Sequence, residues 1–509
     1  MTTHYDSDSG LITVKRKRTR NGSARGFAAA DNPQFLASWA TSQTGPNTNL
    51  QSDLNRVIEM ARDLQDDPYG ASFYGHWVGG VVGSRGYTLE SCAMDSNGTV
   101  DAADKKEIEE AWAEWKKAPN CTPSGDIPYC EWKRLNELSY ARDGGVLIKM
   151  IPAYDGNEFG FAVQSIEVDQ IDLRLNVSKT RTGNRIIMGK EIDDRGRCVA
   201  YHLFGEHPGE TYTTDGGYRR TRVSSEGFLH RFVRRRHAAY QGVPLPIASM
   251  VALRHLNRYA EAEVISARIS ACAVMKEEYT DGVAVNDGKY DDDVDNFDLE
   301  LDPATKWDLP FGKKGELIKP AHPNSSYPEF QKAVLRGAAS GVLMNYNLVS
   351  GDLEGVNYSS LREGKLSQNR VFEAFQTLNI ECEEEPIFRA WLRSAMISRA
   401  VRIPFSRYNQ KRKAKWHRQA VPWVDPLKEA NASKVLLDLG LTSPRRVMAS
   451  LHSDDPDTIM AEIAEDRAKM EALGITMEPA PPAPQEPPSP IDDDDMEEGE
   501  DEPTPNETT

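Results

Sequence analysis

Apolar residues recur along much of this chain with the spacing of one helix face. Residues 48–65 carry such a stripe, through Leu50, Leu54, Val57, Ile58, Ala61 and Leu64. A repeat of three or four residues predicts an amphipathic α-helix. The same pattern predicts further helices over residues 101–118, 131–142, 249–278, 328–343, 359–378, 384–402, 426–439, 443–452 and 455–472.

Residues 145–235 follow a different pattern. Short apolar or alternating segments are separated by Gly, Asn and Asp, which is typical of β-strands joined by turns. These segments read VLIKMI, FAVQSIEV, RIIMG, CVAYHLF and FLHRFV. The glycine-rich run 79–86 also predicts a turn that leads into a strand. With the helices on either side, the chain is expected to have an α+β fold.

The segment 249–278 is the longest predicted helix. It contains neither Gly nor Pro, and small residues are frequent in it. A helix of about 30 residues would be roughly 45 Å long at 1.5 Å per residue. Small side chains would let such a helix approach its neighbours closely.

Two connections stand out between the later helices. Residues 281–325 interrupt the helical pattern with an acidic cluster, Asp291, Asp292, Asp293 and Asp295. The cluster lacks the central Gly and terminal Glu of a calcium loop, so it predicts either a solvated acidic loop or a docking surface. Residues 344–358 are rich in Asn, Gly and Tyr. They exceed the 2–8 residues that usually join two helices.

Charge is distributed unevenly along the 509 residues. The net charge is −17, and residues 478–509 contain twelve acidic residues and no basic ones, which leaves −5 for residues 1–477. This Pro- and acid-rich end predicts a disordered tail. An acidic protein is a poor candidate for tight DNA binding, because affinity for phosphate comes from Lys and Arg. The negative charge is compatible with a passage through which DNA slides. It is equally well explained by solubility alone.

Basic residues gather in three segments. Residues 15–25 predict a flexible basic arm over 1–30, which either is simply solvated or touches DNA, a neighbouring subunit or a scaffold. The arginines in 219–236 favour salt bridges within or between subunits over DNA contacts. The run from Arg407 to Arg418 lies beside Trp416 and Trp423, and predicts with equal weight a nucleic-acid contact or ion pairs with the next subunit.

Nothing in the sequence points to catalysis. The phosphate-binding G-x-x-x-x-G-K-[ST] spacing is absent, and so are H-E-x-x-H, G-x-S-x-G and zinc-type Cys/His spacing. The six cysteines are scattered, which predicts reduced thiols, although Cys121 and Cys130 could bridge a loop. The polar start and the lack of an 18-residue apolar run predict neither a signal peptide nor a membrane helix. No catalytic residue, metal or cofactor is therefore expected.

Three blocks together resemble the lambda-type bacteriophage portal proteins. They are QGVPLPI at 241–247, the stretch from Pro323 to Leu361 that includes Asn357-Tyr358-Ser359-Ser360, and WVDPLKE at 423–429 followed by GLTS at 440–443. Val81-Val82-Gly83 also matches a pattern of that family. The resemblance extends from about residue 34 to about 470.

The resemblance implies a portal fold with an α/β wing, a long helical stem, a small clip and a helical crown, assembled as a ring. On this sequence the parts are a basic arm (1–30), the wing (31–245), stem helix 1 (246–278), the clip (279–325), stem helix 2 (326–343), the tunnel loop (344–358), wing helices (359–425), the crown (426–477) and the acidic tail (478–509).

The resemblance also implies a role and its partners. A ring of about twelve copies at one capsid vertex would nucleate head assembly and pass double-stranded DNA inwards and outwards. It would contact the major capsid and scaffold proteins, dock the terminase large subunit, and later bind the head–tail adaptor. It would be found in the virion, and in the host cytoplasm during assembly, without membrane contact.

Candidate site residues follow from this layout. In the tunnel loop, Asn345, Tyr346, Asn347 and Asn357 are candidates to face DNA, while Tyr358 is expected to pack at the base of the loop. In the clip, Asp291, Asp292, Asp293 and Asp295 are candidates for docking the terminase or the adaptor. Two other functions stay open at this point: a ring or scaffold that binds only protein, and a packaging nuclease or ATPase, against which the missing motifs count.

Overall fold

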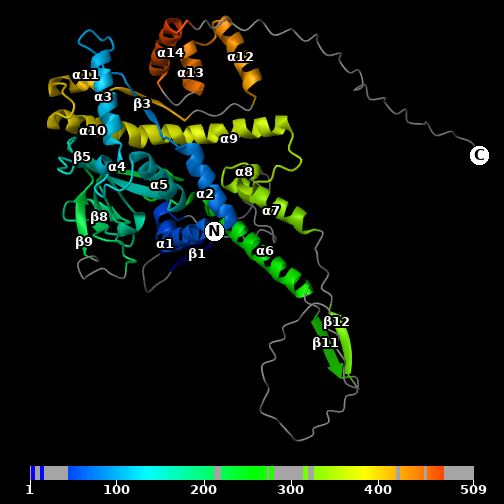
Figure 1. Cartoon of the computed structure of the whole chain (residues 1–509). Coiled ribbons are helices and arrows are strands. Elements are labelled where there is room, and N and C mark those ends of the chain that lie inside the picture. The colour runs from blue at the N-terminus through cyan, green and yellow to red at the C-terminus, as the bar shows by residue number, and fades with distance from the viewer. Residues whose placement is uncertain are drawn as a thin grey trace, which may run out of the picture. The chain divides into compact units, whose positions relative to one another are not determined.

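The structure is a computed structural model that describes residues 2–5, 12–15, 44–210, 219–271, 274–279, 313–318, 326–419, 425–451 and 455–474. Two compact units share the chain (Figure 1). Unit 1 comprises Met1–Val81 and Lys116–Ser394, and unit 2 comprises Val82–Trp115 and Ala395–Thr509. Each unit therefore combines segments that are distant in the sequence.

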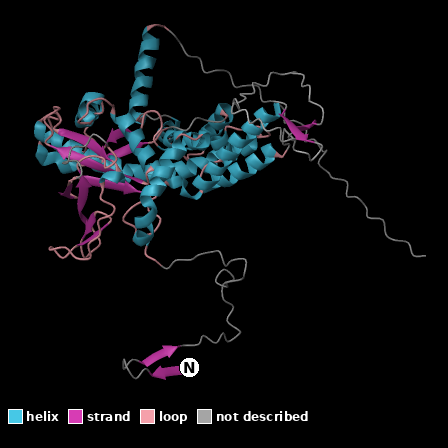
Figure 2. Ribbon diagram, turned by 90° about the horizontal axis from the view of Figure 1, so that it is seen from below, coloured by secondary structure: helices cyan, strands magenta, loops and turns pink. Residues whose placement is uncertain are grey.

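Unit 1 contains the strand-rich region predicted from alternation. In its three-stranded antiparallel sheet, β4 (Gly145–Pro152) lies between β5 (Phe161–Ile166) and β10 (Phe228–Phe232). A four-stranded antiparallel sheet has the order β6 (Arg185–Ile187), β7 (Lys190–Ile192), β8 (Cys198–Phe204) and β9 (Arg220–Ser224). The magenta arrows of both sheets gather in one part of Figure 2. The five predicted strand segments are confirmed, and β7 and β9 complete the second sheet.

One apolar core joins these sheets to the first helix. Leu54 and Ile58 of α1 (Pro46–Gln65) pack with Leu147 of β4 and with Tyr201 and Leu203 of β8. Gly144, just before β4, has φ +81°, and a Cβ there would lie 2.6 Å from the carbonyl carbon of Val243. A glycine is required at that approach, because any larger residue would both strain the backbone and collide with the adjacent chain.

A second core in unit 1 holds the two predicted stem helices together. Leu253 and Leu256 of α6 (Met250–Ala271) pack with Leu335 and Ala338 of α7 (Tyr327–Gly341), and Leu64 of α1 joins them. Tyr259 of α6 extends the contact through rings 5.6 Å from Tyr327 and 5.4 Å from Phe330. The two segments predicted as helices therefore pack against each other within one chain.

The expected helix over 249–278 was too long. The helix ends at Ala271, and Val274–Tyr279 forms β11, which pairs antiparallel with β12 (Lys313–Ile318). Pairing across a long insertion leaves no trace in the local apolar spacing, whereas the absence of Gly and Pro suggested that the helix continued. The acidic cluster predicted for the clip, residues 291–295, lies outside the described residues.

A long helical segment crosses unit 1. The helix α9 (Tyr358–Asn379) continues through a π-helical turn (Ile380–Glu384) into α10 (Glu385–Ser398), as the yellow rod in Figure 1 shows. The break expected between residues 378 and 384 was therefore wrong, because the backbone stays helical and only widens by one residue. Such π-turns accommodate an extra residue within a helix. Here the turn buries Glu383 and Glu384.

The remaining helices of unit 1 are shorter. They are α2 (Pro68–Val81), α4 (Ala118–Cys121), α5 (Tyr129–Arg142) and α8 (Tyr346–Ser350). Trp77 of α2 is buried and lies edge-on to Phe372 and Phe375 of α9. This packing on α9 stabilises α2, which ends at Val81. Residues 82–85 then form the turn that the glycine-rich run predicted before a strand.

Unit 2 is built on a two-stranded sheet and helices. The strand β3 (Thr88–Ser91), expected after the glycine run, pairs antiparallel with β13 (Ala414–His417). The helix α3 (Ala102–Trp115) buries Trp112 and Trp115, which stack at 4.8 Å. The other helices are α11 (Tyr408–Lys411), α12 (Pro426–Asp438), α13 (Pro444–Leu451) and α14 (Pro456–Ala472). The predicted helices 426–439, 443–452 and 455–472 match α12 to α14.

Three smaller expectations are tested in the described residues. Within the arm predicted as flexible, β1 (Thr2–Tyr5) pairs antiparallel with β2 (Ile12–Lys15). Cys121 and Cys130 are both free thiols, so no bridge closes their loop. No helix in the described part of the chain is both long and apolar enough to span a membrane.

Candidate functional site

Asn345, the second residue of the predicted tunnel loop, anchors the start of that loop. Its backbone N–H donates to Oε1 of Gln368 on α9 at 2.9 Å, and its side-chain amide donates to the Gly364 carbonyl. Gln368 also donates to the Leu343 carbonyl at 3.3 Å. Asn345 therefore fixes the start of the loop to α9, a role that sequence reasoning missed.

Tyr346 and Asn347 open the short helix α8 and are half-buried. The Tyr346 hydroxyl donates to Oδ2 of Asp352 at 2.8 Å. Burial, together with this hydrogen bond, raises the pKa of Tyr346, while the Glu354 N–H and the tyrosine hydroxyl lower the pKa of Asp352. The Arg336 guanidinium lies 5.4 Å from the Tyr346 ring centre. The tyrosine thus stabilises the fold of the loop on α7.

Asn357 closes the loop as the N-cap of α9. Its side-chain oxygen accepts from the Ser360 N–H at 2.8 Å. Such a cap satisfies one of the free N–H groups at a helix start. In the sequence Asn357-Tyr358-Ser359-Ser360, one of the stretches that resemble the family, the asparagine therefore has a structural role as a helix cap.

The exposed part of the loop lies between these anchors. Leu353 is 63% exposed, and the Glu354 side chain is 80% exposed. Lys332 of α7 contacts Glu354 at 2.9 Å and Asp352 at 3.7 Å, which orients the tip. Leu353 and Glu354 therefore present accessible side chains at the tip of the loop.

Three arginines of residues 219–236 form ion pairs within unit 1. Arg220 contacts Asp172 at 2.6 Å, and Arg222 contacts Glu191 at 2.6 Å. Arg222 lowers the pKa of Glu191 to about 2. These two ion pairs confirm the interpretation of Arg220 and Arg222 as salt-bridge partners. Both arginines and Glu191 lie on the four-stranded sheet, and Asp172 lies outside its strands.

Arg231 belongs to a larger buried cluster. It contacts Glu137 of α5 at 2.6 Å and Glu383 of the π-turn at 3.1 Å. Lys133 of α5 contacts both Glu383 and Glu384, at 3.3 Å for the latter. Sequence reasoning missed this cluster. The signal was the acidic run 381–385, which interrupts an otherwise amphipathic helix.

The basic run from Arg407 to Arg418 finds acidic partners inside unit 2. Arg407 contacts Asp101 and Asp104 at 3.1 Å each, and the buried Lys411 contacts the same two carboxylates. Lys415 contacts Glu90 at 3.3 Å. For these three residues the partners are therefore within the chain itself, an alternative that the sequence did not suggest.

Comparison with known proteins identifies the family. The family model described as "Phage portal protein, lambda family" matches residues 32–376, about two thirds of the chain. The probable portal protein of Halomonas phage phiHAP-1 is 28% identical over 459 residues, which cover 89% of this chain and 88% of that protein. Portal protein B of Escherichia phage lambda is 24% identical over 160 residues, 30% of each protein.

A solved structure described as the neck of a native GTA particle computed with C12 symmetry also matches. It has 14% sequence identity and a TM-score of 0.45, with 82% of this chain and 97% of that chain covered. The family assignment rests on the sequence matches, which include α6, α7, the loop 344–358 and most of α9. This chain belongs to the lambda family of phage portal proteins.

Proposed function

We propose that about twelve copies of this portal protein form a closed ring at one vertex of the phage head. Double-stranded DNA passes through the ring during packaging and ejection. The observation that carries the proposal is the family match over 32–376, which includes both packed helices α6 and α7 and the loop that follows them.

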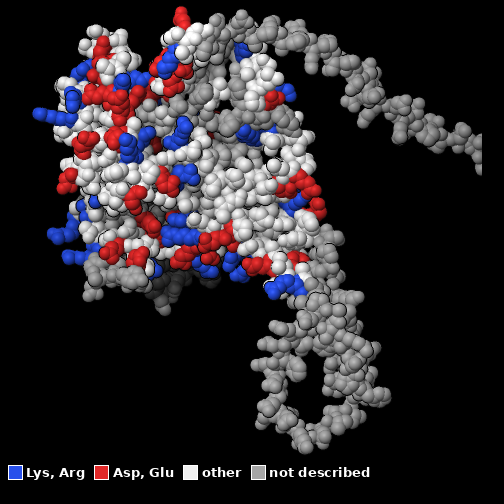
Figure 3. Space-filling view, in the orientation of Figure 1, with Lys and Arg blue, Asp and Glu red and all other residues white. Residues whose placement is uncertain are grey.

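Exposed apolar side chains support assembly of copies. On α7 and around the following loop, Phe330, Leu343 and Leu353 are 52%, 54% and 63% exposed, and Leu361 and Leu366 of α9 are also exposed. Figure 3 shows an uncharged area around α8, bordered by acidic and basic side chains that are interspersed over the rest of this face. Exposed apolar surface of this kind is typical of protein–protein contacts.

The loop 344–358 would line the channel in this ring. Asn345, Tyr346, Asn347 and Asn357 are the loop residues first proposed to face DNA. Their contacts indicate that Asn345 and Asn357 hold the loop ends, so the exposed Leu353 and Glu354 are the better candidates to approach the duplex. An uncharged or acidic lining would let DNA slide, because it offers phosphates no strong attraction.

The remaining partners follow from the same role. The ring would contact the major capsid and scaffold proteins, dock the terminase large subunit and later bind the head–tail adaptor. Asp291, Asp292, Asp293 and Asp295 are proposed to take part in that docking. The protein would act in the host cytoplasm during assembly and remain in the virion.

Electron microscopy of the purified full-length protein tests the ring. We expect closed rings of about twelve copies around a hole wide enough for a duplex, which is roughly 20 Å across. A closed assembly without a channel would contradict the proposal.

A pair of charge substitutions tests the loop. Leu353→Lys adds a positive charge at the loop tip, and Leu135→Lys adds the same charge at a leucine on α5 that is 45% exposed. If the loop surrounds DNA, the added charge attracts the passing phosphates, so only Leu353→Lys reduces the nuclease-protected DNA in particles that otherwise assemble normally. Equal packaging by both variants would argue against the channel-facing loop.

A further inference from the structure

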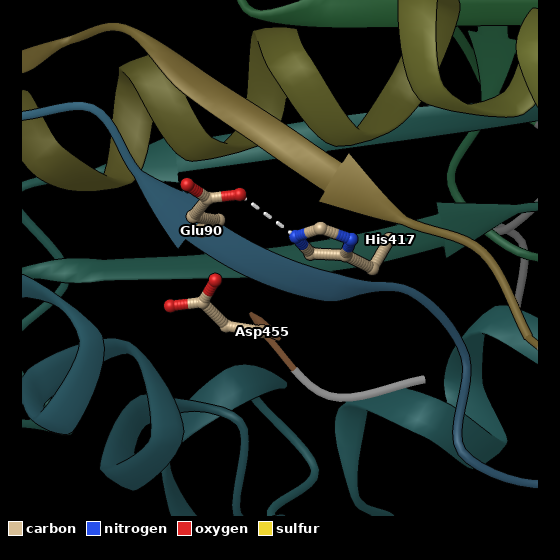
Figure 4. Close-up of side chains that lie close together, drawn as sticks. All are labelled: Glu90, His417 and Asp455. Carbon is tan, nitrogen blue, oxygen red and sulfur yellow. Dashed lines mark hydrogen bonds and ion pairs between the residues drawn. The ribbon is translucent and has the colours of Figure 1, made fainter. Parts of the chain in front are cut away.

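Three side chains with metal-binding atoms meet in unit 2, outside the loop proposed to face DNA. Glu90 comes from β3, His417 from β13, and Asp455 directly precedes α14. One ligand atom from each lies within 4.8 Å of the other two. Figure 4 shows the imidazole and the Glu90 carboxylate facing each other, with the Asp455 carboxylate beside them.

The strand register brings the first two residues together. Glu90 pairs with Lys415 and Thr88 pairs with His417, so Glu90 and His417 are diagonal neighbours on the same face of the sheet. His417 Nε2 lies 2.9 Å from Glu90 Oε2. The three side chains are 10%, 11% and 7% exposed for Glu90, His417 and Asp455. A shielded group of one imidazole and two carboxylates results.

We propose that Glu90, His417 and Asp455 form a binding site for one divalent transition-metal ion, with Zn²⁺ as the preferred ion. One histidine nitrogen and two carboxylate oxygens are ligands that Zn²⁺ accepts, and water would take the fourth position. When the ion binds, the direct hydrogen bond between His417 and Glu90 would be lost. Each of the two residues would instead form one bond to the metal ion.

Asp455 can bind an ion without giving up its role at the helix start. Its Oδ1 accepts from the Asp457 N–H at 3.3 Å as the N-cap of α14, whereas Oδ2 faces Lys105 at 2.6 Å. The two oxygens therefore serve different partners. A metal bound at Oδ2 would link the β3–β13 pair directly to the beginning of α14.

Two lysines compete with a metal ion for this site: Lys105 contacts Asp455, and Lys415, 63% exposed, contacts Glu90 at 3.3 Å. The ammonium group of Lys105 neutralises Asp455 in the metal-free protein. The same group also lies 3.4 Å from Asp457 and 4.0 Å from Glu109. The ammonium group can therefore keep two acidic partners when a metal ion takes Asp455. This competition predicts metal affinity that increases when the lysine charge is removed.

The test uses full-length protein without a histidine tag, stripped with EDTA and desalted, then exposed to Zn²⁺ and desalted again. Elemental analysis should find one zinc ion per chain, and zinc should raise Tm. His417→Ala should lose the bound zinc and the Tm increase, whereas Lys105→Met should bind zinc more tightly. The result does not depend on ring formation, so it stands apart from the proposed function.

His207→Ala is the matched control, because His207 also lies beside two carboxylates, Glu167 and Asp169. There Arg62 already contacts Asp169 at 2.5 Å, and Glu167 is 52% exposed. This variant should bind zinc like the unmodified chain. No bound zinc, or zinc lost in His207→Ala and kept in His417→Ala, would overturn the proposal. If His417→Ala fails to fold, the absorption spectrum of Co²⁺ added to the unmodified chain gives a second readout. A spectrum of the hydrated Co²⁺ ion alone would also overturn the proposal.

Discussion

Arg231 and Glu383 form an ion pair of 3.1 Å in which both side chains are almost completely buried. The pair joins β10 to the π-turn between α9 and α10. Arg231 also stacks over the Tyr140 ring at 3.8 Å, and Asn379 donates to Glu137 at 2.8 Å. A sheet, the helix α5 and the long helical segment of unit 1 therefore meet at one charged cluster.

Replacing Arg231 should be costly, because Glu137 and Glu383 would lose a partner that they share. Arg231→Met is expected to reduce the free energy of unfolding by about 3–5 kcal/mol, the usual cost of removing one partner of a buried ion pair. Urea unfolding followed by circular dichroism measures it. The matched control is Arg134→Met on α5, whose pair with Glu131 at 3.7 Å is exposed and should matter by less than about 1 kcal/mol. Similar losses in both variants would contradict this account of the cluster.

Glu384 should make stability depend on pH. Burial raises its pKa above the ordinary value of 4.5, despite the nearby Lys133. A folded state that holds this proton more tightly than the unfolded state loses stability as pH rises from 4.5 through the folded pKa. Glu384→Gln mimics the protonated acid and removes that loss. The stability of Glu384→Gln relative to the unmodified protein should therefore increase with pH, as measured by thermal unfolding across pH values.

Glu383→Gln provides the control of opposite sign. Burial opposes its ionisation, but Lys133 and Arg231 together lower the pKa of Glu383 below 4.5. Ionised Glu383 therefore stabilises the fold above pH 4.5, and this stabilisation disappears as pH falls through its folded pKa. The deficit of Glu383→Gln should grow as pH rises. Parallel pH profiles for the two variants would show that their environments do not differ in this way.

Lys411 is expected to act on stability and not on DNA binding. Its fully buried side chain neutralises Asp101 and Asp104 in unit 2. Lys411→Met should lower Tm and leave the affinity for duplex DNA unchanged, because a buried ammonium cannot reach a phosphate. The neighbouring Arg412 is exposed, so Arg412→Met should leave Tm unchanged. Scanning fluorimetry and DNA binding at two salt concentrations measure both effects, and weaker DNA binding by Lys411→Met would oppose the prediction.

The turn before β4 should tolerate only glycine. Gly144→Ala is expected to destabilise unit 1 by more than the roughly 1–2 kcal/mol that a positive φ alone costs, because its Cβ would meet the backbone of Val243. Gly183→Ala is the control, since Gly183 has φ +87° but nothing within 4 Å of its Cβ. The difference in unfolding free energy between the two variants measures the cost of the contact with Val243. Equal losses of stability in the two variants would contradict the prediction.

Local patterns determined much of this protein. Apolar periodicity predicted α1, α3, α5, α7 and α12 to α14, and alternation predicted the strands of unit 1, because both depend on neighbours within a few residues. The combination of sequence blocks around 241–247, 323–361 and 423–429 was enough to indicate the family that the comparison then showed.

Tertiary structure decided what depends on distant partners. The end of α6 depends on β11 pairing with β12, and the continuous helix through Ile380–Glu384 depends on Lys133 and Arg231 neutralising its buried acids. The role of Asn345 required Gln368, and the Glu90–His417–Asp455 group required three separated segments to meet. A sequence pattern records the spacing of residues along one element, whereas the charge balance and ligand geometry of these sites exist only after separate elements have packed.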